Sequence, residues 1–456
     1  MQIFDAVISV FDFISNLGAT VMMPIILTIF GLLLGAKFGK ALRAGLTVGI
    51  GFVGLNLVIG AMGDSLAPAV QTMTERFGLT LSTVDVGWPA AAAIAFGSKI
   101  GMMMIPLGLI INIVMLLTNT TQTIDVDIWD YWHFAFTGAL VVSLTGSFYI
   151  GLIATIVNMV IVMVIGDYMA PKVEETLQMP GVSLPHGFTA AFVPIAIVVN
   201  KVIDAIPGVR DIDINIDKLQ KKFGVFGEPM LVGTVLGAII GALAGYDIAK
   251  VLQTGITLGA VLVLIPKMAA LLMEGLMPIS EAASAFVSKR FKNRGKIYIG
   301  LDSAVGVGHP ICLTVSLILV PLAVFLAVAL PGNTVLPMAD LAVFPYIFVL
   351  VVPLVRGNGF RTLVTGVICI IAGLYISTNL APMVTDVAKS VHFAIPEGAT
   401  TISSICDGAN PLTWVLVRAH GLGAIGIIAG IAVAVVLALF NRKRILKEAK
   451  EMRSAS

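Results

Sequence analysis

Hydrophobic runs of about twenty residues dominate the chain and alternate with short polar stretches. An α-helix rises about 1.5 Å per residue, so about 20 apolar residues cross the roughly 30 Å hydrocarbon core of a bilayer. The pattern predicts an all-α integral membrane protein with about eleven transmembrane helices. The predicted spans lie near residues 17–35, 45–63, 99–117, 128–146, 149–168, 227–246, 251–272, 312–331, 341–356, 361–380 and 420–440.

Four other apolar segments are interrupted by proline or glycine, near residues 83–98, 182–203, 298–311 and 393–415. Backbone groups freed by a broken helix need partners inside a bilayer, so such segments survive only when packed in protein or facing a wet cavity. We interpret all four as re-entrant hairpins or discontinuous helices. They are the first place to look for a substrate site.

The two halves of the chain resemble each other. Gly45-Leu-Thr-Val-Gly49 matches Gly255-Ile-Thr-Leu-Gly259, and further matches follow in the same order, including Asp85 with Asp302. If five spans separate equivalent elements, the two repeats are inverted in the membrane, an arrangement typical of transporters. We predict a first repeat at 1–203, a cytoplasmic connector at 204–226, a second repeat at 227–419, and a last transmembrane helix with a basic tail at 420–456.

Basic residues concentrate on one side of the predicted membrane, notably at 286–296 and in the tail from Arg442 to Arg453. Cytoplasmic loops carry an excess of Lys and Arg, so the N-terminus is predicted outside and the C-terminus inside. Residues 1–16 contain Asp5 and Asp12 but neither Lys nor Arg, unlike a cleaved signal peptide. The first span is therefore expected to remain.

Composition agrees with the membrane class. The chain is 58% hydrophobic and 12% charged, with a mean hydropathy of +1.01, which leaves too few polar residues to cover a soluble globule of 456 residues. Its three cysteines, Cys312, Cys369 and Cys406, stand at no metal-ligand spacing. We predict neither a zinc site nor a disulfide framework, and no metal or cofactor.

Three motif-like patterns have simpler explanations. Residues 49–54 match G-x-G-x-x-G but lie within an apolar helix with no strand before them, so close helix contact or approach to a substrate is favoured over dinucleotide binding. Residues 211–222 imitate a calcium loop, yet Ile216 and Lys222 occupy the positions that need Gly and Glu. The basic run at 289–296 follows from the positive-inside rule, so no nucleic acid is expected.

The ionisable groups at the broken segments are the candidate site. A charge at the bilayer centre costs roughly 2.5–3.5 kcal/mol, so such groups point to function. His133 follows an aromatic run and could equally be an interfacial residue. Carboxylates and amides accept hydrogen bonds from hydroxyls and imidazoles can donate or accept, a mixture that suits a neutral polyol. The candidates are Asp85, His133, His186, Asp302, His309, Asp407 and Asn410.

Several segments together resemble one family of membrane transporters. These are the opening run, Gly-Phe-Val-Gly-Leu-Asn-Leu-Val-Ile-Gly at 51–60, Asp-Val-Gly-Trp-Pro at 85–89, Gly-Val-Gly-His-Pro at 306–310 and Cys-Asp-Gly-Ala-Asn-Pro-Leu-Thr-Trp at 406–414. They are similar to the IIC membrane components of the phosphoenolpyruvate-dependent sugar phosphotransferase system, in its ascorbate and galactitol group and especially the galactitol-specific members. The resemblance extends over essentially the whole chain.

This resemblance implies a homodimer in a bacterial cytoplasmic membrane, with a scaffold domain and a core domain of inverted repeats that carries the substrate. The substrate would be galactitol or a related polyol, moved by an elevator-type motion and phosphorylated inside by a separate IIB protein supplied by IIA. In the ascorbate member, histidines, an acidic residue and glycine backbone contact the substrate. By place along the chain these fall on His133, His186, Asp302 or His309, and on Gly54 and Gly306. Where that member has glutamine after its second histidine, this chain has Gly187.

No phosphoryl-accepting residue is predicted in this chain. It has no phosphate loop, and its cysteines lack the accessible, electropositive setting that a reactive thiolate needs. We expect the phosphotransfer partners to dock at 286–296 and 204–226. A proton- or sodium-coupled polyol carrier remains an alternative from sequence alone, whereas a membrane enzyme would need a catalytic set that no His and carboxylate spacing supplies.

Overall fold

The computed structural model describes residues 19–33, 35–77, 81–125, 127–212, 229–290, 296–337, 339–391, 393, 395 and 401–455. Most of these residues are helical, which confirms the predicted all-α class. Among them, five helical stretches are long and apolar enough to cross a membrane, namely Phe148–Leu177, Gly187–Ala205, Pro310–Ala329, Gly359–Ser390 and Ala424–Glu451.

The secondary structure falls into two similar series. The first contains α2 (Ala19–Leu33), α3 (Phe38–Phe77), β1 (Thr83–Asp85), α4 (Gly87–Gly97), α5 (Lys99–Leu117), β2 (Thr123–Asp125), the 3₁₀ helix η1 (Ile128–Asp130), α6 (Tyr131–Thr145), α7 (Phe148–Leu177), β3 (Val182–Ser183), α8 (Gly187–Ala191) and α9 (Val193–Ala205). In both series a helix is followed by a much longer helix, and three very short strands alternate with helices after it.

The second series follows the same order. It contains α11 (Pro229–Leu243), α12 (Ile248–Arg290), β4 (Tyr298–Gly300), α13 (Ala304–Val307), α14 (Pro310–Ala329), β5 (Val335–Leu336), the 3₁₀ helix η3 (Leu341–Val343), α15 (Phe344–Val349), α16 (Val351–Leu354), α17 (Gly359–Ser390), β6 (Thr401–Ser403), α18 (Ile405–Gly408) and α19 (Pro411–Gly421). Helix α20 (Ala424–Ala455) ends the chain outside this correspondence.

The short strands join the two series into one body. One three-stranded sheet has the order β5-β1-β6 and the other β2-β4-β3, and all pairs are parallel. Each series therefore supplies the central strand of one sheet and both outer strands of the other. These ladders satisfy backbone groups at the breaks, where a bilayer would leave them without partners.

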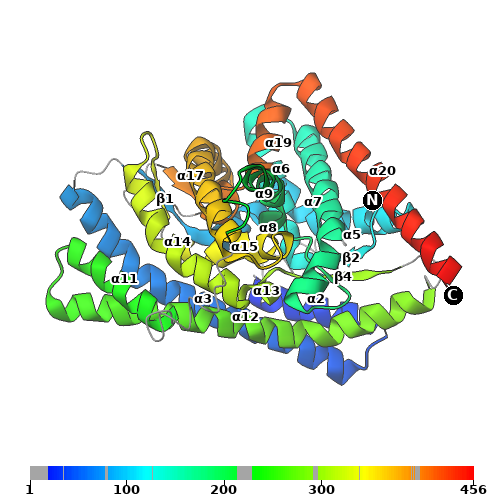
Figure 1. Ribbon diagram of the computed structural model, residues 1–456, viewed down its shortest axis with the longest axis horizontal. Helices are drawn as coiled ribbons and strands as arrows, with labels where there is room; N and C mark the ends of the chain where they lie inside the picture. The colour runs from blue at the N-terminus through cyan, green and yellow to red at the C-terminus, as the bar shows by residue number, and fades with distance from the viewer. Residues whose placement is uncertain are drawn as a thin grey trace.

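Helices α2, α3, α11 and α12 form the lower layer in Figure 1, with α6, α7, α9, α15 and α17 above them. Glycines let the long helices approach closely. A Cβ on Gly54 of α3 would lie 2.2 Å from Met268 Sδ of α12, and one on Gly255 would lie 2.6 Å from the Thr234 carbonyl oxygen of α11. The Gly-rich motif at 49–54 thus serves helix contact in this structure.

A helix lies at each of the eleven predicted span positions. Some of these helices are longer than the predicted span, and one is shorter and interrupted. Helices α3 and α12 contain 40 and 43 residues, far more than a perpendicular crossing needs. The span expected at 341–356 contains a broken apolar helix over Phe344–Leu354, about 16 Å long. Pro353 explains the interruption at Leu350, since proline lacks the N–H that a continuous helix uses, whereas Pro345 stands in the first turn of α15, where proline is tolerated.

Only part of the predicted partner-docking surface is described. The connector at 204–226 is described as far as Ile212, and residues 213–228 and 291–295 lie outside the described residues. At its start, Arg361 Nη2 of α17 lies 2.7 Å from Asp204 Oδ1 and 3.0 Å from the Arg210 carbonyl oxygen, to which it donates. Lys296 pairs with Glu174 at the end of α7.

Candidate functional site

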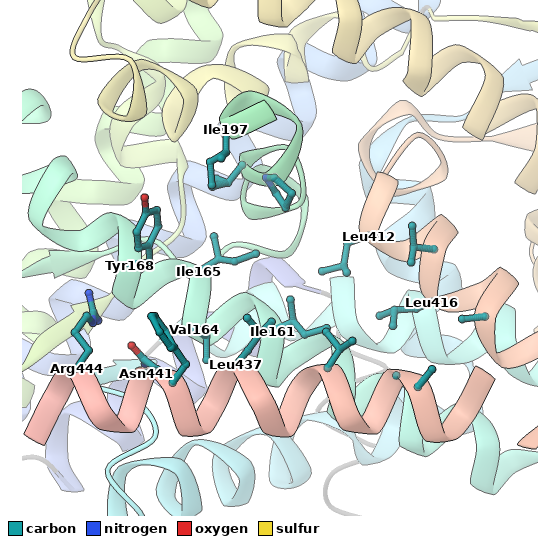
Figure 2. Close-up of a pocket in the computed structure, with 18 residues that line it drawn as sticks. Ile161, Val164, Ile165, Tyr168, Ile197, Leu412, Leu416, Leu437, Asn441 and Arg444 are labelled. Carbon is teal, nitrogen blue, oxygen red and sulfur yellow. The ribbon is translucent and has the colours of Figure 1, made fainter. Parts of the chain in front are cut away.

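An apolar cavity of about 550 Å³, here termed the apolar groove, lies between α7, α9, α19 and α20 (Figure 2). Its walls are aliphatic and aromatic carbon, and its few polar residues, Tyr168, Asn441 and Arg444, gather at one end. A polar solute would lose its hydrogen bonds to water along most of this groove without replacement. The apolar groove is therefore not the candidate transport site.

A second cavity, here termed the polar cavity, lies where the broken segments of the two series meet. Its lining residues are Trp88, Trp129, Asp130, Trp132, His133, His186, Asp302, Val343, Tyr346 and Cys406. Its volume is about 30 Å³, which leaves room for no more than a few water molecules. Any larger solute can enter only when this cavity opens.

Breaks in the helices bring the polar side chains together. Asp130 ends η1, and His133 follows on the first turn of α6. His186 stands before the first residue of α8, where its Nδ1 accepts the Thr189 N–H at 3.3 Å. Asp302 comes two residues after β4 and accepts the Ala304 N–H at 2.8 Å. At each of the three breaks, a helix end or a hydrogen bond to a backbone N–H therefore fixes the direction of the polar side chain.

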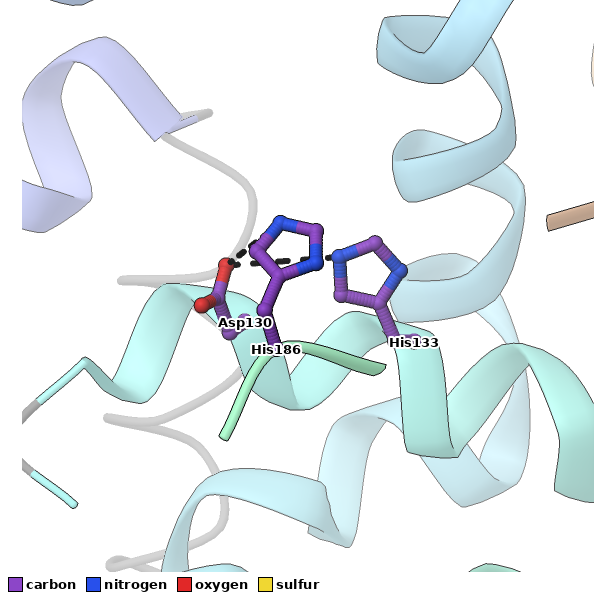
Figure 3. Close-up of side chains that lie close together, drawn as sticks. All are labelled: Asp130, His133 and His186. Atoms are coloured by element: carbon purple, nitrogen blue, oxygen red, sulfur yellow. Dashed lines mark ion pairs between the residues drawn. The ribbon is translucent and has the colours of Figure 1, made fainter. Parts of the chain in front are cut away.

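Figure 3 shows His186 and His133 beside Asp130. The two imidazole rings have centroids 4.4 Å apart. Asp130 Oδ1 lies 3.7 Å from His186 Nε2 and 4.0 Å from His133 Nε2. The other oxygen of Asp130, Oδ2, is buried and has no hydrogen-bond partner among the described residues. Asp130, which lines the cavity, therefore keeps one carboxyl oxygen without a partner, and in Figure 3 this oxygen points away from the two imidazole rings.

A hydrogen-bond chain determines the tautomer of His133. Its Nδ1 lies 2.8 Å from Asp407 Oδ2, and a carboxylate can only accept, so the neutral imidazole carries its proton on Nδ1. Asn410 Nδ2 donates to the other Asp407 oxygen at 3.0 Å and to the Gly187 carbonyl at 3.1 Å. His133 Nε2 is left as an acceptor facing the cavity.

His186 has the opposite tautomer. Its Nδ1 accepts from a backbone N–H, which can only donate, so the neutral ring carries its proton on Nε2. That Nε2 lies 3.4 Å from Asp302 Oδ1. The two histidines thus offer one acceptor and one donor to the same small space.

Two buried aspartates tie the hairpin tips of one series to the other. Asp127 Oδ2 accepts the Asp302 N–H at 3.0 Å, and Asp340 Oδ1 accepts the Trp88 N–H at 2.7 Å. Asp340 Oδ2 also accepts from Ser404 Oγ at 2.6 Å. These contacts position the cavity walls by fixing the backbone that carries them.

The polar cavity is rich in acceptors and lacks positive side chains. Asp130 and Asp302 line it, Asp127 and Asp407 lie just behind, and its described lining includes neither Lys nor Arg. An anionic solute would find no positive side chain in this described lining to pair with. A neutral molecule with several hydroxyl donors matches the arrangement, because each hydroxyl can donate to a carboxylate or to His133 Nε2.

Five of the predicted residues meet at or behind this cavity, and four others lie elsewhere. His133, His186, Asp302, Asp407 and Asn410 form the connected group. Asp85 accepts the Gly87 and Asp340 N–H groups at 3.2 and 2.9 Å, and His309 Nδ1 accepts the Ile311 N–H at 3.3 Å at the start of α14. Gly54 faces Met268, and Gly306 faces Val349.

Sequence reasoning missed Asp127, Asp130, the three tryptophans and Tyr346. Residues 125–133 read Asp-Val-Asp-Ile-Trp-Asp-Tyr-Trp-His, and we interpreted their aromatic side chains as a membrane-interface entry. The signal for a site was the presence of three acidic residues in this run, Asp125, Asp127 and Asp130, which are two and three positions apart. The structure places Trp129, Asp130 and Trp132 around the polar cavity.

Three overlapping groups of side chains have ligand atoms within 4.8 Å of one another: Asp130 with His133 and His186, His133 with Cys406 and Asp407, and Asp127 with Asp130 and Asp302. Protein hydrogen bonds already account for the Nδ1 atoms of both histidines, for one oxygen each of Asp127 and Asp302, and for both oxygens of Asp407. This geometry does not by itself call for a metal ion.

Comparisons with known proteins give one consistent result. The family model for the PTS system sugar-specific permease component, EIIC-GAT, matches residues 12–398. The chain is 42% identical over 409 residues to the "PTS system galactitol-specific EIIC component" of Escherichia coli strain K12, covering 90% of each chain. The protein with the same name from Escherichia coli O157:H7 matches with the same identity and coverage.

Proposed function

Because the chain belongs to the EIIC-GAT family of PTS system sugar-specific permease components, we propose that it carries galactitol, or a closely similar polyol, across the cytoplasmic membrane with coupled phosphorylation. The main evidence that the substrate is a neutral polyol is the set of side chains that line the polar cavity. The Asp130 carboxyl lines this cavity, beside one histidine that accepts and one that donates. An uncharged chain of hydroxyls can use all three.

We propose direct polyol contacts for Asp130, His133, His186 and Asp302. Asp407 and Asn410 act through His133 and through the Gly187 backbone, so they are positioning residues. Asp85 holds the backbone at the equivalent hairpin of the other sheet, and His309 holds the start of α14. Gly54 and Gly306 contribute by allowing close helix contact.

The energy for accumulation would come from phosphoryl transfer. A separate IIB protein, supplied by IIA, phosphorylates the polyol on the inner side so that it cannot leave. The three cysteines of this chain are buried, so they are unsuited to accept a phosphoryl group from a soluble donor. The similarity to phosphotransferase components disfavours a proton- or sodium-coupled carrier.

The proposed architecture is a homodimer of eleven-span protomers with two inverted repeats, N-terminus outside and C-terminus inside. The recurring order of elements and the reciprocal exchange of strands between the two series support duplication. The basic residues after the apolar part of α20 support an inner C-terminus. The core would carry the polyol by an elevator-type movement against a scaffold.

Uptake of radiolabelled galactitol into membrane vesicles that contain this chain tests the function. Galactitol phosphate should accumulate only with phosphoenolpyruvate and the soluble phosphotransfer proteins, and should persist when an uncoupler collapses the proton gradient. Accumulation of free galactitol that the uncoupler abolishes would overturn the proposal.

A further inference from the structure

The apolar groove extends from the membrane interface into the hydrocarbon. Helix α20 is apolar as far as Phe440 and continues as Asn441-Arg442-Lys443-Arg444, a change expected where a helix leaves the bilayer core. Helix α7 is aligned with it at this level, because Arg444 Nη1 donates to the Asp167 carbonyl at 3.1 Å. The polar residues at one end of the groove in Figure 2 therefore mark its interfacial end.

Positive charge gathers at that end. Lys172 Nζ lies 3.8 Å from the Tyr168 ring centroid and 3.2 Å from the Tyr168 carbonyl oxygen. An ammonium has three donors, and this carbonyl takes one of them. Arg444 lines the groove itself, and its Nη1 and Nη2 donate to the neutral Asp167 carbonyl and Gln122 Oε1. Its nearest acidic contact, Glu448 Oε1, lies 3.9 Å from Nε, beyond hydrogen-bond range. Two cations and a tyrosine thus stand at the mouth of an apolar channel.

We propose that the apolar groove binds an acyl chain of an anionic phospholipid, with the lipid phosphate beside Lys172 and Arg444. The groove has the volume of a typical ligand site, and its walls offer almost no hydrogen bonds. An apolar peptide would match the walls but not the cations, and a free phosphate would match the cations but not the walls. An anionic amphiphile uses both features, and the cytoplasmic leaflet supplies such lipids.

Native mass spectrometry of the purified full-length protein tests this directly. The protein is titrated with dioleoylphosphatidylglycerol, with dioleoylphosphatidylcholine, which has the same chains but no net charge, and with glycerol 3-phosphate alone. We expect the anionic lipid to bind at least about fivefold more tightly than the zwitterionic lipid. Equal retention of the two lipids, or equally tight binding of glycerol 3-phosphate, would overturn the proposal.

Three variants locate the binding. Val433→Phe enlarges an exposed side chain that lines the groove and should reduce retention of both lipids. Lys172→Gln should weaken only the anionic lipid, by about fivefold. Lys172 is not a lining residue itself but contacts the lining residue Tyr168. Lys443→Gln makes the same charge change on an exposed residue of α20 outside the groove lining and should have little effect. If Lys443→Gln weakens the lipid as much as Lys172→Gln does, the attraction belongs to the surface in general and the site is refuted.

Discussion

The substitution Asp407→Asn should invert the hydrogen-bonding role of His133. Asn410 Nδ2 donates to Asp407 Oδ1 and to the Gly187 carbonyl, so the new amide must keep its oxygen toward Asn410. Its NH₂ group then faces His133 Nδ1, 2.8 Å from the original Oδ2. An NH₂ group only donates, so Nδ1 must become the acceptor and the ring proton moves to Nε2. The polar cavity thereby loses an acceptor and gains a donor.

The expected cost follows from what the proposed substrate loses. A hydroxyl that donates to His133 Nε2 would face an N–H instead, and its proton would have no partner. Leaving a buried donor unsatisfied costs about 1–3 kcal/mol, which corresponds to a loss of galactitol affinity of about 5- to 150-fold. Isothermal titration of the purified protein with galactitol measures this loss.

Fluorinated galactitols test whether the loss of affinity comes from the hydroxyl that donates to His133 Nε2. A C–F group cannot donate, so the fluoro analogue at the relevant position should bind wild type poorly and should be penalised less in Asp407→Asn. Asp386→Asn makes the same chemical change at an exposed position of α17 and should leave binding and melting temperature unchanged. The reasoning is refuted if Asp407→Asn binds galactitol like wild type, or if it loses the same factor for galactitol and for every analogue.

Three further predictions concern the same region. Asp130→Asn replaces a carboxyl oxygen at the polar cavity by an NH₂ group, which cannot accept, and should lower galactitol affinity about tenfold with little change in melting temperature; unchanged affinity in titration would exclude a contact. Gly300→Ala places a Cβ 2.9 Å from the Asp125 Cα between paired strands and should destabilise the fold by about 1–3 kcal/mol, whereas Gly308→Ala meets nothing within 4 Å and should melt like wild type; similar melting of both variants contradicts this. Cys406 lines the polar cavity and is buried until that cavity opens, so galactitol in the opened cavity should slow its modification by a membrane-permeant maleimide, measured by peptide mass spectrometry, and an unchanged rate would argue against binding there.

The helices and their breaks could be predicted because each has a local cause. About twenty apolar residues must span a bilayer, and Pro185 or Gly187 interrupts a helix whatever surrounds it. The same breaks identified His186 and Asp302, which the structure brings within 3.4 Å of each other. Polar side chains at helix breaks can therefore be identified as site candidates from the sequence, without knowledge of tertiary contacts.

The remaining features depend on contacts between distant segments. The six strands have two or three residues each, too few for any alternation to be read, and their pairing joins β1 to segments more than two hundred residues away. Asp130 was hidden because an acidic and aromatic run also suits a membrane interface. Only the fold places it beside His186 of another broken segment, and that contact makes it a candidate.

The way in which the two series are joined limits how the polar cavity can open. It must grow from about 30 Å³ to admit a hexitol. Separating the series would break the strand pairs of both sheets and the buried bonds from Asp127 to the Asp302 N–H and from Asp340 to the Trp88 N–H. Moving side chains at the rim, such as Trp88 or Tyr346, leaves all of these in place. An elevator-type movement requires a substrate-bearing unit that stays intact while its rim opens. For this reason we favour that movement over rocking of one half of the chain against the other.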